Sequence, residues 1–288
     1  MAPELHPDTP YVSPRPVTDL AACAFYHTME VPGVGVVEGQ WDLRAGVDRY
    51  LGGIDVRGRR VLEMGTADGY LSFHLERRGA DVVSFDLGPD DSWDVVPYAR
   101  GRPAGPGEDR AATTEPPSWV TRRPTGAGAG MQRVHNAYWF AHRAFHSRAR
   151  LVWGSVYDVP AAIGHVDVTV FGSLLLHTRD PFRALAGALA LTRRTVVVTD
   201  ALGRLHLPRW LRSVRERLPP PLRRPLMRFM PDWATGTGPD GWWRLTPEIV
   251  VAFLGVLGFE RSRVTTHRQL YRGQAKALFT VVAQRTDT

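Results

Sequence analysis

An acidic residue directly before a turn of small residues is the feature of this sequence that most clearly predicts chemistry. Residues 61–70 read VLEMGTADGY, in which Glu63 ends an apolar run and Gly65, Ala67 and Gly69 follow at alternate positions. An apolar strand that runs into such a turn and then into a helix is a setting in which nucleotide ligands bind. Glu63 would repel a pyrophosphate but attract a cation, and the spacing is not the G-x-G-x-x-G of dinucleotide sites. The turn therefore predicts a ligand with positive charge and no phosphate, such as S-adenosylmethionine (SAM).

A second acid, Asp86, ends the next apolar run at residues 81–86. In nucleotide-binding α/β folds an acid near this point accepts hydrogen bonds from ribose hydroxyls. Asp86 and the turn thus predict parts of one site. The alternative is a solvated strand end beside a tight strand–helix junction that binds nothing.

Two titratable residues follow later apolar runs and are candidates for proton transfer. His177 comes after the run at 166–171, and an imidazole titrates near neutrality, as a general base should. Asp200 comes after the run at 195–199 and is the second candidate. The alternative for each is structural: His177 would fix the following loop, and Asp200 would cap one.

Aromatic side chains are candidates for contacts with the substrate, because ring faces attract cations and pack against flat groups. Ordinary core packing is the alternative for each ring. Together with one arginine near His177, the predicted substrate-binding residues are Tyr26, Trp41, Trp93, Arg179 and Trp242.

The elements that must position these residues alternate between strand and helix. Apolar runs predict strands at 60–64, 81–86, 150–154, 166–171, 195–199, 260–266 and 277–283. Helices are expected at 18–29, 41–51, 69–78, 131–147, from 181 onward, at 203–230 and from 247 to 257. This alternation predicts an α/β, Rossmann-like fold with a seven-stranded, mostly parallel sheet, an antiparallel last strand, helices on both faces and an N-terminal helical cap.

The expected domain organisation follows from the same pass along the chain. A flexible tail (1–16) and an N-terminal helical cap (17–55) precede a SAM-binding domain (56–284). Two segments interrupt that domain: a Gly- and Pro-rich insertion at 87–130, expected to be a mobile lid on the substrate side, and a basic helical cap at 203–245.

Composition limits the function classes. The 288 residues carry a formal net charge of +7 and a single cysteine, which excludes an internal disulfide and a multi-cysteine metal site, so no metal is predicted. The sequence shows neither an apolar run long enough to span a bilayer nor the apolar stretch of a signal peptide, and the expectation is a cytoplasmic protein. The basic charge allows nucleic acid as a partner but does not by itself indicate it.

These motifs resemble those of the Rossmann-like, class I SAM-dependent methyltransferases. Residues 63–69 are similar to the first motif of that family, Asp86 to the second, 153–156 to the adenine-contacting end of the third strand, and 167–177 to the fourth-strand motif. Ala67 replaces the usual middle glycine, and Ser155 stands where an aspartate often holds the adenine amino group. The resemblance implies SAM as cofactor, with S-adenosylhomocysteine (SAH) as product, and these cofactor-binding residues: Glu63, Gly65, Thr66, Ala67, Gly69, Tyr70, Asp86, Ser155, Val156 and Phe171.

Residues 174–181 and 242–247 are similar to one subgroup, the bacterial wobble-uridine carboxymethyltransferases of tRNA and their relatives. In that subgroup a tyrosine before the histidine helps hold a carboxylated SAM, and here that position is Leu176. Plain SAM and a small-molecule acceptor therefore fit better. The sequence predicts transfer of a methyl group to oxygen or nitrogen of such an acceptor, in secondary metabolism. A tRNA-modifying methyltransferase and a SAM-fold protein that binds the cofactor without methyl transfer stay open as alternatives, and the oligomeric state is not predicted.

Overall fold

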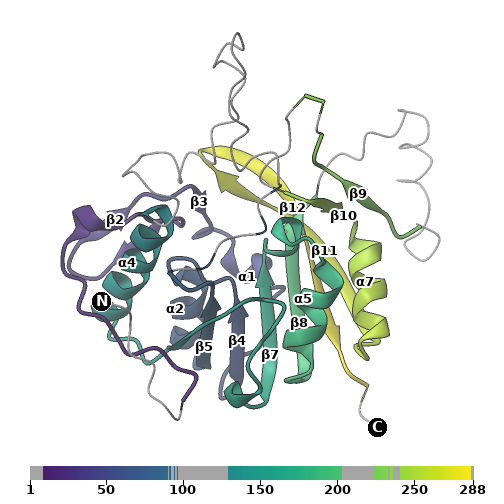
Figure 1. Ribbon diagram of the computed structural model, residues 1–288, viewed down its shortest axis with the longest axis horizontal. Helices are drawn as coiled ribbons and strands as arrows, with labels where there is room; N and C mark the ends of the chain where they lie inside the picture. The colour runs from purple at the N-terminus through teal and green to yellow at the C-terminus, as the bar shows by residue number, and fades with distance from the viewer. Residues whose placement is uncertain are drawn as a thin grey trace.

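A twisted β-sheet with helices on both faces forms the centre of the protein in the computed structural model (Figure 1). The structure describes residues 9–89, 91, 94, 96, 129–202, 224–232, 234–235 and 241–286. Its eight strands lie in the order β3-β11-β12-β8-β7-β4-β5-β6. The strands are β3 (Trp41–Asp42), β4 (Arg60–Met64), β5 (Asp81–Asp86), β6 (Arg150–Trp153), β7 (Val166–Gly172), β8 (Thr192–Ala201), β11 (Arg261–Tyr271) and β12 (Gln274–Gln284).

Five strands, β4 to β8, are all parallel to one another. Both faces of these strands are buried, which explains their near-continuous apolar sequences. In β4, for example, Val61 faces one half of the core and Leu62 the other, and both are fully buried. The carboxyl ends of the five strands therefore meet along one edge, where ligands bind in such sheets.

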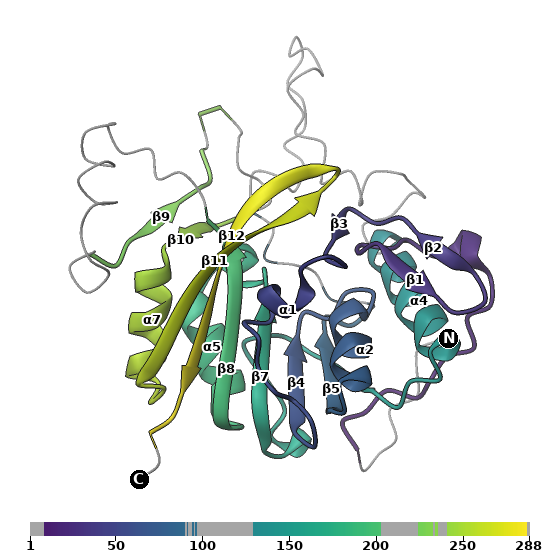
Figure 2. The same cartoon turned by 180° about the vertical axis from the view of Figure 1, so that it is seen from behind.

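The chain ends in an antiparallel hairpin. Strand β12 pairs with β11 and, in antiparallel register, with β8, which confirms the predicted α/β fold with an antiparallel last strand. Both strands run further than predicted and meet at a tight turn, where Arg272 and Gly273 have positive φ. The hairpin curves along the sheet until its tip reaches β3 (Figure 2). The two-residue β3 is an eighth strand that the predicted seven-stranded sheet did not include.

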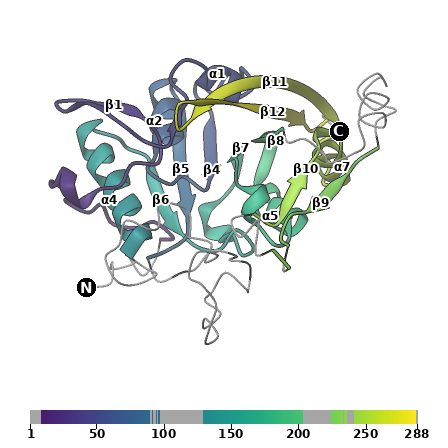
Figure 3. The same ribbon diagram turned by 90° about the horizontal axis from the view of Figure 1, so that it is seen from above.

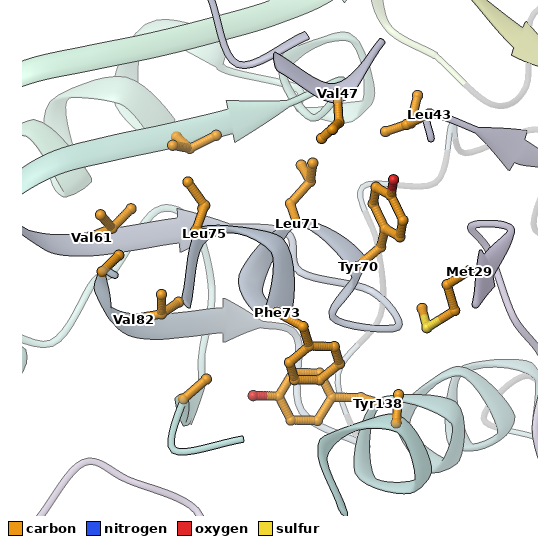
Figure 4. Packing of buried hydrophobic residues seen from close by; sticks show 14 of the residues in the cluster. Met29, Leu43, Val47, Val61, Tyr70, Leu71, Phe73, Leu75, Val82 and Tyr138 are labelled. Atoms are coloured by element: carbon orange, nitrogen blue, oxygen red, sulfur yellow. The ribbon is translucent and has the colours of Figure 1, made fainter. Parts of the chain in front are cut away.

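The sheet separates the core into two layers, and helices cover both of its faces (Figure 3). One face carries α1 (Val47–Tyr50), α2 (Tyr70–Arg77) and α4 (Ala129–Ala144), and the packing around Phe73 and Tyr138 on that face is shown in Figure 4. The other face carries α5 (Pro181–Leu189) and α7 (Pro247–Val256), with the 3₁₀ turns η4 (Ala161–Ile163) and η5 (Leu175–His177) in the connections. Both α5 and α7 begin as predicted: Asp180 and Thr246 are their N-cap residues, and a proline occupies the first helical position of each. None of the helices among the described residues is long and apolar enough to cross a membrane.

The predicted N-terminal helices at 18–29 and 41–51 are wrong, and the cap at 17–55 is mostly not helical. The segment forms a 3₁₀ turn, η1 (Leu20–Ala22), a hairpin of β1 (Met29–Val31) and β2 (Gly35–Val37), then β3 and the one-turn helix α1. The hairpin forms because Gly33 and Gly35 adopt positive φ between valine-rich runs, which favour extended backbone. The helical spacing after Trp41 is real only over the four residues of α1.

The predicted flexible tail is also ordered where the structure describes it. Val12 is buried, and its backbone N–H donates to the Leu151 carbonyl on β6 at 2.8 Å. The Tyr11 hydroxyl accepts a hydrogen bond from Arg60 at 2.8 Å. An open edge strand offers unpaired backbone groups, and Val12 satisfies one of them.

Most of the insertion at 87–130 and of the basic segment at 203–245 lies outside the described residues, so the predicted lid stays a prediction. The helical prediction is wrong at both described strands of the basic segment. Here β9 (Met227–Phe229) and β10 (Trp243–Leu245) pair as an antiparallel ribbon. The residue before Pro247 is forced toward extended backbone, and Thr246 adopts φ −93° and ψ 156°, which continues β10 and not a helix.

Candidate functional site

A cavity of about 570 Å³ lies at the carboxyl ends of the parallel strands. This volume is within the range of about 300–1,000 Å³ that is typical of small-molecule sites. Its lining comes from the segments that follow β4, β5, β6, β7 and β8, from the tip of β11, and from the N-terminal region. The lining residues include Tyr26, Trp41, Gly65, Ala67, Asp86, Leu87, Asp94, Met131, Val134, Ser155, Val156, Gly172, Ser173, Leu174, Leu176, His177, Arg179, Ala201 and Tyr271.

The turn after β4 is held in a conformation that its small residues allow. Gly65, Ala67 and Gly69 all have positive φ, at 77°, 52° and 82°. A Cβ at Gly69 would lie 2.5 Å from the Phe73 ring, so this glycine is required by packing as well as by φ. Ala67 is the non-glycine member and is therefore strained.

Asp86 connects this turn to the cavity. Its carboxylate accepts hydrogen bonds from the N–H of Ala67 at 2.6 Å and of Leu87 at 2.8 Å. Burial raises its pKa to about 6, although both N–H groups oppose that shift. Asp86, Gly65 and Ala67 therefore lie together on one side of the cavity, and their contact with a cofactor stays a prediction.

Glu63 lies beneath the turn and does not line the cavity. It is 1% exposed and accepts hydrogen bonds from the hydroxyls of Thr66, at 2.8 Å, and Ser72. Burial raises its pKa to about 7. Glu63 and Thr66 thus fix the turn from below, and their contact with a ligand stays a prediction.

The turn after β4 and the ends of β5 and β6 line one half of the cavity. Around the ends of β5 and β6 this half is largely apolar. Ser155 and Val156, both predicted cofactor contacts, line it after β6. Sequence reasoning missed Leu87, Met131 and Val134, which line it from the end of β5 and from α4. The spacing of apolar residues in α4 did not indicate that Met131 and Val134 line a cavity.

Three other predicted cofactor residues do not line the cavity. Phe171 is fully buried in the sheet on the α5 side, since its side chain alternates away from the cavity. Tyr70 begins α2 and stacks on His27, with ring centroids 5.4 Å apart at 25°. Gly69 supports the turn. Their contact with a cofactor stays a prediction.

The segment after β7 brings His177 and Arg179 to the cavity. Ser173 adopts φ +52°, and its N–H donates to the Thr199 carbonyl at 2.7 Å, which bends the chain into η5. His177 ends η5 half-buried. Arg179 forms an ion pair at 3.3 Å with Asp94, a lining residue that the sequence did not single out.

Of the remaining predicted substrate residues, Tyr26 and Trp41 line the cavity, whereas Trp242 does not. Trp242 supports the lining instead: its backbone N–H donates to the Leu176 carbonyl at 2.8 Å, and its indole N–H donates to the Asp94 carbonyl. Trp93 lies outside the described residues.

Asp200 is buried at 2% exposure and is not in the cavity lining, although its neighbour Ala201 is. One carboxylate oxygen accepts the Ala201 N–H at 2.6 Å, and Oδ2 has no hydrogen-bond partner among the described residues. Burial raises its pKa to about 7. A proton-transfer role for Asp200 stays a prediction.

Sequence reasoning also missed Asp68, an acid inside the glycine turn. Asp68 is fully buried and accepts hydrogen bonds from the N–H groups of Tyr26, at 2.8 Å, and His27, at 2.7 Å. The His27 Nδ1 lies 2.6 Å from its other oxygen. An acid among small turn residues was the available signal, but nothing in the sequence indicated its N-terminal partners.

No family model matches this chain, and no curated protein matches it in sequence. Solved structures do resemble it at low identity. The N-terminal domain of EvdMO1, crystallised with SAH and D-fucose, is 16% identical, with 90% of each chain covered and a TM-score of 0.48. A magnesium protoporphyrin IX methyltransferase from Synechocystis PCC 6803 with bound SAH is 14% identical over 84% of this chain and 81% of that chain, with a TM-score of 0.45. A Burkholderia thailandensis 1,6-didemethyltoxoflavin-N1-methyltransferase is 15% identical over 84% and 76% of the two chains, with a TM-score of 0.46.

Proposed function

We propose that this chain is a SAM-dependent methyltransferase that transfers a methyl group to oxygen or nitrogen of a small-molecule acceptor. The observation that carries the proposal is the contact between Asp86 and the Ala67 N–H on the wall of the cavity. Asp86 would accept hydrogen bonds from the ribose hydroxyls, and the small residues of the adjacent turn would let the ligand approach the backbone closely.

The lining of this half of the cavity fits SAM. Asp86 offers carboxylate oxygens to the ribose hydroxyls, and Ser155 offers a hydroxyl near the end of β6. Leu87, Met131 and Val156 provide apolar surface for adenine. Within the described ranges Arg179 is the one arginine or lysine in the lining, and it is paired with Asp94, so a pyrophosphate would find no free cation there.

When bound, SAM supplies an electrophilic methyl group on a sulfonium. The protein's part is to hold and orient the reactants, since most of the acceleration of such an in-line transfer can come from positioning. Gly172 ends β7 in the middle of the sheet, and Ser173 and Leu174 follow it; all three line the cavity between its two halves. They are the residues that would surround the reacting groups.

His177 is the proposed proton acceptor for a hydroxyl substrate. It lines the cavity, it follows the fourth parallel strand along the chain, and its backbone is fixed by a hydrogen bond to the Leu174 carbonyl at 3.0 Å. Asp200 is the second candidate for this role. It would have to reach the cavity past Ala201, because its own side chain is buried behind the lining.

Calorimetry with SAM, SAH and NAD tests the cofactor assignment. We expect SAM and SAH to bind and NAD to show no binding, and Asp86→Ala to weaken SAM binding by about tenfold or more, because a hydrogen bond to a charged group contributes about 1.5–3 kcal/mol. Asp81→Ala is the matched control, since Asp81 begins the same strand but is exposed. Tight NAD binding, or unchanged SAM affinity in Asp86→Ala, would contradict the proposal.

A further inference from the structure

The second half of the cavity is lined from the N-terminal region and from the tip of the terminal hairpin. Asp86, Leu87, Ser155 and Val156 line the first half from the ends of β5 and β6. The hairpin of β11 and β12 curves over the carboxyl edge of the sheet, so that its tip and β3 lie on the side of β4 and β5 (Figures 2 and 3). Three aromatic side chains line the cavity from these segments, and none of the three carries a charge: Tyr26, Trp41 and Tyr271.

These three residues form a continuous aromatic surface. Trp41 and Tyr271 are paired across β3 and β11, and their ring centroids lie 4.9 Å apart at 48°. The Trp41 indole N–H donates to the Tyr26 hydroxyl at 3.1 Å. Burial raises the pKa of Tyr26 to about 12, so its hydroxyl stays protonated and uncharged at neutral pH. We name Tyr26, Trp41 and Tyr271 the aromatic wall.

The charges around this wall disfavour a cationic ligand. The guanidinium of Arg272 lies 5.3 Å from the centre of the Tyr271 ring. The nearest acid in sequence, Asp42, is occupied by Arg44 in an ion pair at 2.7 Å. A cation placed against the Tyr271 ring would meet the positive charge of Arg272, so this part of the aromatic surface favours flat, uncharged aromatic groups by stacking.

The aromatic wall is joined to the cofactor turn through Asp68. Asp68 follows Ala67, which lines the cavity and donates to Asp86. The same Asp68 accepts the backbone N–H groups of Tyr26 and His27 and contacts the His27 ring. Tyr26 is therefore held at a fixed position relative to the turn, and Trp41 is held relative to Tyr26.

We propose that the aromatic wall is the acceptor-binding surface, that it takes an uncharged, flat aromatic acceptor, and that Asp68 is the positioning residue that aligns it with the cofactor. This inference rests on the proposed methyltransferase function. It names the acceptor class and adds His27, Asp68 and Tyr271 to the residues that serve the site.

The test of acceptor class uses three probes that share a naphthalene ring and differ in charge: neutral naphthol, anionic naphthoate and cationic naphthylmethylammonium, all substituted at the same ring position. Binding is measured by calorimetry and by NMR saturation transfer, with and without saturating SAH. We expect naphthol to bind at least about tenfold more tightly than the ammonium probe. Equal or tighter binding of the ammonium probe would overturn the acceptor class. Failure of SAH to bind counts against the proposed function, whereas absence of naphthol binding in both conditions counts against the aromatic wall.

Variants of Tyr271 locate the probe. Tyr271→Ala should weaken naphthol binding by about tenfold, as the loss of one aromatic stacking contact of up to about 1.5 kcal/mol implies, and Tyr271→Phe should retain it. Phe229→Ala is the control, because Phe229 is 52% exposed on β9 and does not line the cavity. SAH affinity should stay the same in all three. Unchanged naphthol binding in Tyr271→Ala would contradict the proposal.

Asp68→Asn and His27→Gln test the positioning role. Asp68→Asn keeps the shape but cannot accept all three hydrogen bonds, so naphthol affinity should fall by a larger factor than SAH affinity. His27→Gln removes only the ring contact and should give a smaller loss in the same direction, which keeps the test decisive if Asp68→Asn does not fold. A matched loss of SAH and naphthol affinity in the folded variants would show that Asp68 only supports the turn and would overturn the positioning role.

Discussion

The two halves of the cavity are built in different ways. The half over β4, β5 and β6 depends on a short stretch of chain with strict local requirements: positive φ at Gly65 and Gly69, and an acid at Asp86. The half lined by the N-terminal region and the hairpin tip gathers Tyr26, Trp41 and other side chains from segments that are far apart in the sequence. The comparison shows that the first half depends on local backbone requirements of one short segment, whereas the second depends on contacts between distant segments.

The largest expected effect is on chemistry between the two halves. If the acceptor is a hydroxyl compound, His177→Gln should lower turnover by about 10²–10⁴-fold, the usual range for a positioned general base, with SAM affinity unchanged. Turnover is measured by mass spectrometry of the methylated product, alongside calorimetry with SAM. If the acceptor is a neutral amine, the loss should be small because its lone pair is already available. A fall in SAM affinity with intact turnover per loaded enzyme would return His177 to a structural role.

The next effect concerns the strict geometry of the cofactor half. Gly69→Ala should lower the free energy of unfolding by about 2–4 kcal/mol, because its Cβ would lie 2.5 Å from Phe73 and 2.8 Å from Tyr138 at a φ of +82°. Gly53→Ala is the matched control: its φ is +65°, but a Cβ there meets nothing within 4 Å. Chemical denaturation compares the two. An equal cost at both positions would show that φ alone, and not packing around the turn, determines the requirement.

A third prediction concerns pH and the carboxyl beneath the turn. Burial raises the pKa of Glu63 from 4.5 to about 7, so the folded state holds this proton more tightly than the unfolded state. The contribution of Glu63 to stability is then fully present below pH 4.5 and is lost as the pH rises toward 7. Glu63→Gln should therefore gain stability relative to the unsubstituted protein between about pH 5 and pH 8, by up to roughly 2 kcal/mol.

Denaturation at several pH values measures this difference. Glu38→Gln is the control, since Glu38 is exposed in the N-terminal region. A stability difference that does not change with pH would contradict the raised pKa of Glu63.

The smallest expected effect is at Ala67. Its φ of +52° favours glycine, so Ala67→Gly should raise the free energy of unfolding by up to about 1 kcal/mol while SAM binding is retained. Thermal denaturation and calorimetry measure the two quantities. A loss of stability would show that the turn needs the alanine side chain for packing.

The same contrast explains what the sequence could predict. The turn, Asp86 and the parallel strands were predictable, because their signals are local: burial on both faces, small residues at positive φ, and caps such as Asp180. The N-terminal region was not, because pairing of Trp41 with Tyr271 and the burial of Asp68 depend on contacts between distant segments. Helical spacing over a few residues is too short to compete with such pairing.

The burial of Glu63 and Phe171 illustrates a second limit. A residue type beside a motif indicates that a side chain is near the site, but its direction depends on the register of the strand. Glu63 is the last but one residue of β4 and faces Thr66 and Ser72 beneath the turn, although its position in the sequence equally suited a ligand contact.

A crystal structure of the protein with SAH tests the central claim most directly. We predict electron density for SAH over β4, β5 and β6, with the ribose hydroxyls on Asp86 and adenine beside Val156. The aromatic wall of Tyr26, Trp41 and Tyr271 should stay uncovered at the other half of the cavity. Density for SAH against the aromatic wall, or a ribose that makes no contact with Asp86, would contradict the division of the cavity into a cofactor half and an acceptor half.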